Sequence, residues 1–354
     1  MTTILDDHVQ MQALDPDNMM AYLQALPTDL LKAWRIGGEQ NLPPLGNIRQ
    51  VIISGMGGSA IGADMAATYA AYTGLVPVHV HRDYGLPSWV QGQETMVIAS
   101  SHSGNTEETL SSYMEARMRG CRCMAVCTGG KLAAMAGNDG IPVWLFQHTG
   151  QPRAAVPFSF GLLLAALTRL QILPDPQKEL MEAAECMEAQ ARQLDPVIPV
   201  SANPAKRQAG QWMNRWVTVM ASDYLTPIAR RWKGQVNELA KAWAQFENLP
   251  EADHNSLAGI FMPESVLTQT VVMFLQSPSD HPRNRLRSEL TRQMILEAGI
   301  GTDVYHARGK SPLAHMWTSL QFGDYSAYYL AMLYGMDPTP IPTLVALKNA
   351  LSGQ

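Results

Sequence analysis

A glycine-rich stretch near residue 55 has the residue types that bind a phosphate group. Gly55-Met56-Gly57-Gly58-Ser59 follows the apolar run Val51-Ile52-Ile53 and precedes a helix-like segment. A glycine turn at the start of a helix presents main-chain N–H groups to an anion, and Ser59 adds a hydroxyl donor. The sequence therefore predicts an anion site at this turn, formed by Gly57, Gly58 and Ser59.

A second loop, at residues 101–106, is rich in hydroxyl groups. It contains Ser101, Ser103 and Thr106, and Gly104 allows close approach of the backbone. Neither loop contains lysine. Hydroxyl and N–H donors suit a single phosphate monoester, whereas a dinucleotide pyrophosphate is bound chiefly by backbone amides. Serine and threonine can also act only as caps and turn formers, but two such loops at strand ends favour one shared phosphate site.

A nicotinamide-dependent dehydrogenase is the competing interpretation of the first loop. Gly55, Gly57 and Ala60 satisfy a loose dinucleotide-binding fingerprint. That fingerprint also requires an acidic residue about 20 positions later, at the end of the second strand. Asp83 comes later than this and lies beyond the expected end of that strand. The hydroxyl-rich second loop therefore favours a monophosphate over a dinucleotide.

The elements around these loops alternate between strand and helix. Short apolar runs predict strands at 51–54, 77–81, 95–100, 121–128 and 141–145, with a helix at 60–72. This alternation is typical of a doubly wound α/β fold with a parallel sheet. Ligands of such sheets bind at the carboxyl ends of the strands, and both loops are expected there.

The second half of the chain repeats this rhythm without a strong sequence repeat. We expect strands at 216–222, within 265–275 and at 302–306, and helices at 226–243, 313–334 and 343–351. Helices are also expected at 158–173 and 177–194, where proline punctuation marks a connection. The predicted organisation is a helical arm at 1–45, a first α/β domain at 46–155, a helical connection at 156–200, and a second α/β domain with a C-terminal helix at 201–354.

Composition narrows the class of protein. The 354 residues are 46% hydrophobic and 16% charged, with a net charge of −5, which suits a globular protein and argues against nucleic-acid binding through a basic surface. No apolar run has the length of a membrane span, and the N-terminus lacks the features of a secretory signal. The cysteines at 121, 123 and 127 match no zinc-site spacing, so we expect buried thiols, no metal, and a cytoplasmic location.

Taken together, the two loops resemble the phosphate loops of the sugar isomerase (SIS) fold. More narrowly, most of the chain is similar to the bifunctional phosphoglucose/phosphomannose isomerases. The similarity extends to Gly150-Gln151-Pro152-Arg153-Ala154-Ala155, Glu238-Leu239-Ala240-Lys241, Asp253-His254-Asn255, and Asp337-Pro338-Thr339-Pro340 followed by Lys348. The resemblance implies two SIS subdomains and an isomerase that interconverts glucose 6-phosphate and mannose 6-phosphate with fructose 6-phosphate. It implies a cis-enediol intermediate and no cofactor.

The resemblance also implies roles for four residues. Glu238 would carry the proton between carbons, and Arg153 would stabilise the negative charge of the enediolate. His254 would open the sugar ring, with Lys348 near the ring oxygen. His254 is expected to come from the partner subunit of a homodimer, so a complete site would require two chains.

Three points leave alternatives open. A non-catalytic sugar-phosphate sensor would need the two loops but not the four residues together. Out of context, Glu238 could also be a solvated residue paired with Lys241. His102, between the two loop serines, departs from the family pattern and could contact phosphate, which leaves the sugar preference uncertain.

Overall fold

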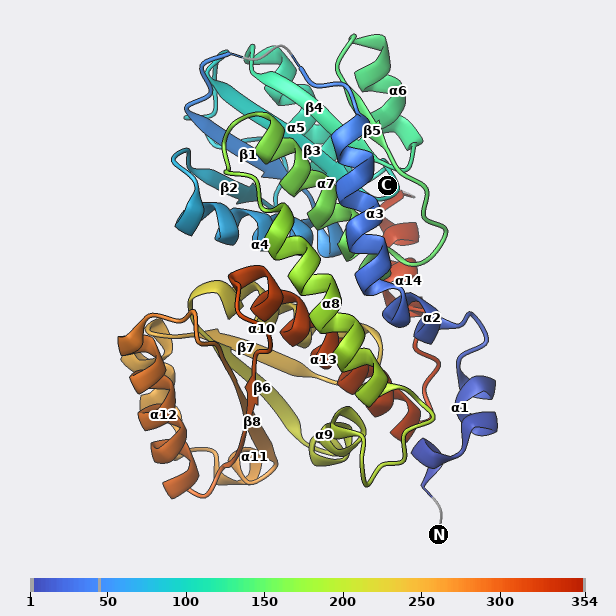
Figure 1. Ribbon diagram of the computed structural model, residues 1–354, viewed down its shortest axis with the longest axis vertical. Helices are drawn as coiled ribbons and strands as arrows, with labels where there is room; N and C mark the ends of the chain where they lie inside the picture. The colour runs from blue at the N-terminus through green and yellow to red at the C-terminus, as the bar shows by residue number, and fades with distance from the viewer. Residues whose placement is uncertain (1–2, 44–45, 353–354) are drawn as a thin grey trace.

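The computed structural model describes residues 3–43 and 46–352 and contains two parallel β-sheets (Figure 1). The first sheet has the order β2-β1-β3-β4-β5. Its strands are β1 (Gln50–Ser54), β2 (Val78–His81), β3 (Thr95–Ser101), β4 (Arg122–Cys127) and β5 (Val143–Leu145). The direction of strand progression reverses between β1 and β3, which is the switch point where doubly wound sheets bind ligands. Both phosphate-loop candidates follow these two strands.

The second sheet has the order β7-β6-β8-β9 and is also parallel. Its strands are β6 (Trp216–Ala221), β7 (Ala244–Asn248), β8 (Thr270–Gln276) and β9 (Gly301–His306). The prediction of two doubly wound parallel sheets is therefore confirmed. The sheets lie in separate halves of the molecule, and α8, light green in Figure 1, runs from the first half into the second.

Helices cover the faces of both sheets. The helices before residue 170 are α1 (His8–Leu14), α2 (Met19–Gln24), α3 (Leu26–Glu39), α4 (Gly57–Thr73), α5 (Glu107–Met118), α6 (Gly130–Asn138) and α7 (Val156–Arg169). Those later in the chain are α8 (Gln177–Leu194), α9 (Pro204–Trp212), α10 (Thr226–Glu238), α11 (Glu264–Leu267), α12 (Pro282–Glu297), α13 (Pro312–Leu333) and α14 (Pro342–Ser352). Among the described helices, none combines the length and apolarity that crossing a bilayer requires.

One predicted helix was wrong at its C-terminal end. The expected helix at 226–243 ends at Glu238, and residues 244–248 form β7, an edge strand. Lys241 has a φ of +55°, a left-handed conformation that ends the helix and turns the chain toward the sheet. Only Ala244 of β7 is fully buried, so the strand lacks the continuous apolar run that marks a central parallel strand. Helices α9 and α12 were not predicted.

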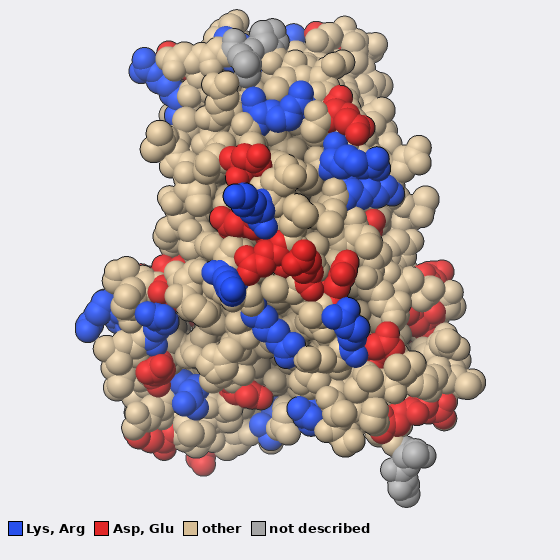
Figure 2. All heavy atoms as spheres, viewed as in Figure 1, with Lys and Arg blue, Asp and Glu red and all other residues tan. Residues whose placement is uncertain are grey.

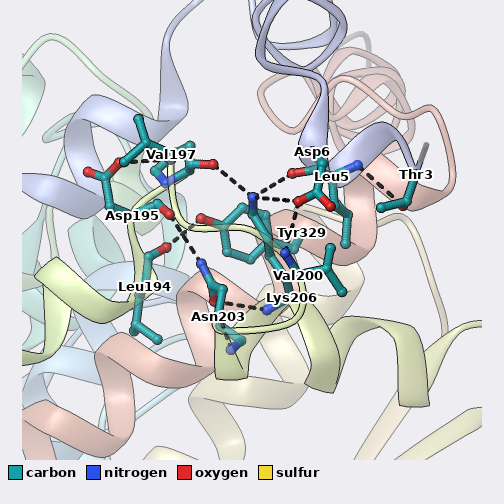
Figure 3. A network of polar contacts seen from close by, with 12 residues as sticks. Thr3, Leu5, Asp6, Leu194, Asp195, Val197, Val200, Asn203, Lys206 and Tyr329 are labelled. Carbon is teal, nitrogen blue, oxygen red and sulfur yellow. Dashed lines mark hydrogen bonds and ion pairs between the residues drawn. The ribbon is translucent and has the colours of Figure 1, made fainter.

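The N-terminal arm packs on both halves of the molecule. Helix α3 lies against α7 of the connection, through contacts such as Ala165 near Gly37. The first turn instead contacts α9, where the fully buried ammonium group of Lys206 donates to the main-chain carbonyls of Leu5 and Pro196 (Figure 3). Burial lowers the pKa of Lys206, opposed by Asp6 at 3.6 Å. The arm is thus part of the fold. Residues 1–2 and 44–45 of its predicted span, and 353–354 at the other end of the chain, lie outside the described residues.

The surface carries charges of both signs. Figure 2 shows Lys and Arg interspersed with Asp and Glu over the visible face, including the waist between the two halves. No broad basic surface appears on this face, in keeping with the net charge of −5.

Asp280, after β8, is a buried carboxyl group with incomplete hydrogen bonding. Its side chain is 4% exposed; Oδ2 accepts the N–H of Ser277 at 2.8 Å, and Oδ1 has no partner among the described residues. Burial raises the pKa of Asp280 to about 7, and the neighbouring Asp223 adds to the rise. The folded protein therefore holds a proton on this group that the unfolded chain releases near pH 4.

This carboxyl group makes the folded protein less stable as the pH rises. Because its pKa is higher in the folded state, its stabilisation is complete below about pH 4 and is lost as pH rises through 7. In the native chain this group should lower the free energy of unfolding by about 3 kcal/mol between pH 5 and 8. We expect Asp280→Asn, which keeps an acceptor for Ser277, to abolish that decrease. Urea unfolding at both pH values measures this, with Asp17→Asn at an exposed position as the control. Equal pH slopes for Asp280→Asn and the native chain would contradict the assignment.

Candidate active site

The first phosphate-loop candidate lies where β1 meets α4. Gly57 has a φ of +52°, a conformation that favours glycine, and Gly58 lies directly against the backbone of Pro152. A Cβ at Gly58 would be 2.4 Å from the carbonyl oxygen of Pro152. Ser59 is buried, and its Oγ accepts the N–H of His102 at 3.1 Å. The two loops are therefore in contact.

The second loop follows β3 and is held by its own hydroxyl groups. Ser101 Oγ lies 2.9 Å from Thr106 Oγ1 and accepts the N–H of Gly104 at 3.1 Å. Ser103 is exposed, and its Oγ accepts the N–H of Asn105 at 3.2 Å. Gly104 has a φ of +66° and lies against Gly129, where no side chain would fit. The loop therefore presents its hydroxyls at the carboxyl end of β3, beside Ser59.

The ring of His102 packs against other rings. Its Nε2 lies 3.1 Å from His148 Nδ1, and Phe146 lies edge-on to it. Burial lowers the pKa of His102, and burial together with His102 lowers the pKa of His148 to about 4. Both imidazoles are then neutral near pH 7. The expected contact of His102 with phosphate remains a prediction, and its main-chain N–H is the group that reaches Ser59.

A pocket of about 410 Å³ lies between the first loop and helix α10. Gly57 and Gly58 line one side, and Glu238, the last residue of α10, lines the other. Glu238 is the single acidic group among the described lining residues. The cationic lining residues are Arg82, Arg153, Arg230, Arg231 and Lys233. This excess of positive charge suits an anionic ligand.

Arg153 and Glu238 meet in this pocket. Arg153 is 2% exposed, and its Nη1 lies 3.5 Å from Glu238 Oε2, whose side chain is 31% exposed. Arg153 Nη2 donates to the carbonyls of Pro338, at 2.7 Å, and Thr339, at 2.5 Å. The Nε of Arg153 is buried without a partner among the described residues. Burial lowers the pKa of Arg153, and the Glu238 carboxylate opposes that change.

A second arginine holds the first in place, and sequence analysis missed it. Arg231 donates to both carboxylate oxygens of Asp324, at 3.0 and 2.7 Å, and to the carbonyl of Arg153 at 2.8 Å. Arg231 and Asp324 are both buried. The signal was available, because Asp324 is the one acidic residue in the long apolar segment 312–333. A lone carboxylate in such a helix requires a buried cationic partner.

Arg82 and Arg230 were also missed, and they share one carboxylate at the pocket edge. Asp64 of α4 pairs with Arg82 and lies 2.9 Å from Arg230. Arg82 additionally donates to the carbonyl of Ala60, at 3.1 Å, and the guanidinium of Arg230 lies over the ring of Phe246. These contacts join the first loop to α10 from the side opposite Arg153.

His254 lies away from this pocket within one chain. It ends a 3₁₀ turn, Glu251–His254, and is exposed. Glu238 precedes the start of β7 and His254 follows its end, and the five residues of the strand span about 16 Å. The neighbouring carboxylate of Asp253 accepts from Arg287 at 2.9 Å and from Thr291 at 2.7 Å, both on α12. The carboxylate thereby fixes the turn on α12.

Lys348 lies in α14, which starts shortly after the residues that Arg153 binds. The helix begins at Pro342, and Lys348 is exposed in its middle. It does not line the pocket that contains Arg153 and Glu238. The structure thus brings together Arg153, Glu238 and the glycine loop, and it places His254 and Lys348 outside that pocket in a single chain.

Known proteins are similar to this chain over most of its length. Residues 201–351 match the model of the bacterial phospho-glucose isomerase C-terminal SIS domain. A bifunctional phosphoglucose/phosphomannose isomerase of Caldicellulosiruptor bescii is 36% identical over 92% of this chain and 97% of its own. The chain belongs to the bifunctional phosphoglucose/phosphomannose isomerase family. The enzyme of that name from Aquifex aeolicus is 32% identical over 85% of this chain and 90% of its own.

A solved structure shows the same fold. A glucose-6-phosphate isomerase like protein from Thermus thermophilus has a TM-score of 0.63 at 20% identity, and the match covers 99% of each chain. The match to the family model spans the predicted second domain. The predicted family, SIS fold and enzyme class are therefore confirmed.

Close packing at Gly58 should make this glycine irreplaceable by alanine. A Cβ there would collide with the backbone of Pro152 and displace Arg153. We expect Gly58→Ala to lower the free energy of unfolding by about 1–3 kcal/mol, measured by urea unfolding. The control is Gly210→Ala in α9, where a Cβ meets nothing within 4 Å. It should instead stabilise the helix by about 0.5–1 kcal/mol, and equal effects of the two changes would refute the contact.

Proposed function

We propose that this chain is a cofactor-free aldose–ketose isomerase that interconverts glucose 6-phosphate and mannose 6-phosphate with fructose 6-phosphate. Membership of the isomerase family supports the substrate class. The observation that carries the proposal is the contact of the buried Arg153 guanidinium with the Glu238 carboxylate, at 3.5 Å, in a pocket bounded by the glycine loop. A base beside a fixed cation is the pair that proton transfer next to a carbonyl requires.

In the proposed mechanism Glu238 is the base for carbon. Its carboxylate removes the proton from C2 of the open-chain aldose, and the electron pair of that bond forms the C1–C2 double bond. The C1 carbonyl oxygen gains a proton, which gives the cis-enediol. Loss of the proton on O2 then forms the C2 carbonyl, and Glu238 returns its proton to C1. Arg153 stabilises the negative oxygen that develops in each half of the reaction.

The same intermediate accounts for two substrates. Glucose 6-phosphate and mannose 6-phosphate differ only at C2, and the enediol is planar there. One base beside one planar intermediate can therefore serve both epimers, provided that the C2–C3 bond rotates. Nothing in these steps needs a metal or a redox cofactor.

We assign the phosphate of the substrate to the two loops. Gly57, Gly58 and Ser59 supply N–H and hydroxyl donors from the start of α4, and Ser101, Ser103 and Thr106 supply hydroxyls from the neighbouring loop. Support comes from the contact between the loops at the switch point of the sheet. A non-catalytic sugar-phosphate sensor could use the same loops. It would have no use for a buried cation facing Glu238.

Ring opening is assigned to His254 from the partner subunit, with Lys348 near the ring oxygen. In one chain His254 is exposed and separated from Glu238 by the length of β7, which supports delivery to a second copy. The proposed assembly is therefore a homodimer. We also propose a cytoplasmic location, which the four free thiols suit, three of them buried at 121, 123 and 127.

Replacing the base should abolish turnover without releasing the phosphate. The native chain, treated with EDTA, should convert glucose 6-phosphate and mannose 6-phosphate to fructose 6-phosphate. We expect Glu238→Gln to lower kcat by about 10³-fold or more, with fructose 6-phosphate binding retained in calorimetry, because the loops are untouched. Glu264→Gln, at an exposed position on α11, is the control. An active Glu238→Gln protein would show that Glu238 is not the base. A native chain that binds the sugar phosphate but does not convert it would favour a non-catalytic sensor.

Mixing two inactive variants tests the shared site. Glu238→Gln and His254→Ala chains should each be inactive alone. If His254 acts across the interface, a mixed dimer holds one complete site, so refolding the two together should restore up to about one quarter of the native activity. The measurement is the isomerase rate after co-refolding at equal concentrations. A mixture as inactive as its components would place His254 outside the partner's site.

A further inference from the structure

A second cavity, of about 520 Å³, lies behind the turn that follows Glu238. We call it the Trp243 cavity. Its lining residues are Asn214, Arg215, Trp216, Ala240, Lys241, Ala242, Trp243, Ser265, Val266, Gln269, Tyr334 and Met336. It opens at the amino ends of β6 and β7, the opposite end of the sheet from His254. None of its described lining residues also lines the neighbouring pocket of Arg153 and Glu238.

The cavity wall is mostly aromatic and apolar. The rings of Trp216 and Trp243 meet edge to face, with centroids 6.2 Å apart. Trp243 is 69% exposed, although a tryptophan of a folded protein usually buries most of its surface. Val266 and Met336 are also exposed beside it. Two indole rings in a cavity of this volume form a surface on which a planar ligand could stack.

The charged side chains that line the cavity are all positive. Arg215 and Lys241 are its cationic residues, and none of the described residues that line it is acidic. Burial and the charge of Arg153 lower the pKa of Lys241 to about 8, and the nearby carboxylates of Asp337 and Glu238 oppose that change. A ligand that brings a negative charge into the cavity would further favour the charged ammonium group. The lining therefore selects an aromatic anion over a neutral or cationic aromatic compound.

The cavity shares two segments with the catalytic pair. Lys241 Nζ donates to the carbonyl of Glu238 at 2.8 Å, and Asn237 Nδ2 donates to the carbonyl of Ala242 at 2.8 Å. The turn at 239–243 is thus fixed to the last turn of α10. On the other side, Tyr334 and Met336 lead into residues 338–339, whose carbonyls accept from Arg153. A ligand in the cavity touches the supports of both Glu238 and Arg153.

We propose that the Trp243 cavity binds a small aromatic anion, a planar ring carrying a carboxylate, sulfonate or phosphate, and that this binding alters catalysis through the 239–243 turn. The ring stacks on the exposed indole of Trp243 beside Trp216, and the anionic group pairs with Arg215 and Lys241. The second half of the proposal rests on the isomerase function proposed above, whereas the binding half does not.

The binding half is tested with 8-anilinonaphthalene-1-sulfonate, a fluorescent aromatic anion, and the full chain. We expect saturable binding that Trp243→Ala weakens by at least about tenfold and that Arg215→Met also weakens. Trp89→Ala, at an exposed tryptophan of the first domain, should bind as the native chain does. Excess fructose 6-phosphate should not compete with the probe for the cavity, so any shift in the affinity of the probe should level off at saturating sugar phosphate. Circular dichroism confirms that each variant is folded.

Two results would overturn the site. In the first, native and Trp243→Ala chains bind the probe equally. In the second, neither binds it and Trp243→Ala lowers the mass of the assembly in ultracentrifugation, which would assign the cavity to a subunit interface. Either outcome can be read whether or not the chain proves to be an isomerase.

The coupling half is tested by the isomerase rate in the presence of the probe. We expect kcat or KM to change at least about twofold in the native chain and in Trp89→Ala, with no change in Trp243→Ala. Substrate should shift the affinity of the probe by the same factor as the probe shifts that of the substrate, because linkage is reciprocal. If the probe binds but the isomerase rate is unchanged, the binding site stands and the proposed coupling to catalysis is refuted.

Discussion

The buried ion pair of Arg231 and Asp324 is the contact on which the arrangement of the active site depends. It joins α10 to α13 in the second half, and the same guanidinium donates to the carbonyl of Arg153 in the segment after the first sheet. Both side chains of the pair are buried, so loss of either would leave an uncompensated charge, at a cost of about 3–5 kcal/mol. One side chain thus fixes α10, which carries Glu238, relative to the turn that carries Arg153.

This fixation explains how a cation can lie buried beside Glu238. Two main-chain carbonyls accept from Arg153, and its ion-pair partner Glu238, at 3.5 Å, is partly exposed. The guanidinium therefore keeps donor capacity, including the unpartnered Nε. Donors held by the fold in advance need no reorganisation when negative charge develops, which is the condition for electrostatic catalysis. The Asp324 carboxylate compensates Arg231, so Glu238 and a ligand are the groups left for Arg153.

Local sequence was sufficient for the central strands and the loops that follow them. Residues 51–54 and 95–100 are continuous apolar runs because both faces of a parallel sheet are covered, and each ends in a glycine- or hydroxyl-rich turn. The edge strand β7 carries no such run, and its sequence continues the pattern of α10. What ends that helix is the left-handed conformation of Lys241, which no residue preference indicates.

The candidate site was less predictable, because its groups come from segments far apart in the chain. Arg153, Arg231 and Asp324 lie in three different segments, and each alone is a common charged residue. Resemblance to the family identified Arg153 and Glu238, but Arg231 had no motif to mark it. The pairing of Asp253 with α12 was missed for a related reason, since α12 itself was not predicted. Tertiary contacts decided these cases.

The second half of the chain has the sheet order of the first, yet its corresponding loop is closed to anions. Ser277-Pro278-Ser279 follows β8 as Ser101-His102-Ser103 follows β3. In the second loop both serine hydroxyls point to His315 Nδ1, at 3.0 and 2.9 Å, since Nε2 donates its proton to the carbonyl of Gly309. Asp280 follows the serines, and Asp223 stands where the first half has its glycine turn. The carboxylate of Asp223, beside the buried Asp280, disfavours a phosphate in this loop, which supports our assignment of the phosphate to the loops of the first half and of the base to the second.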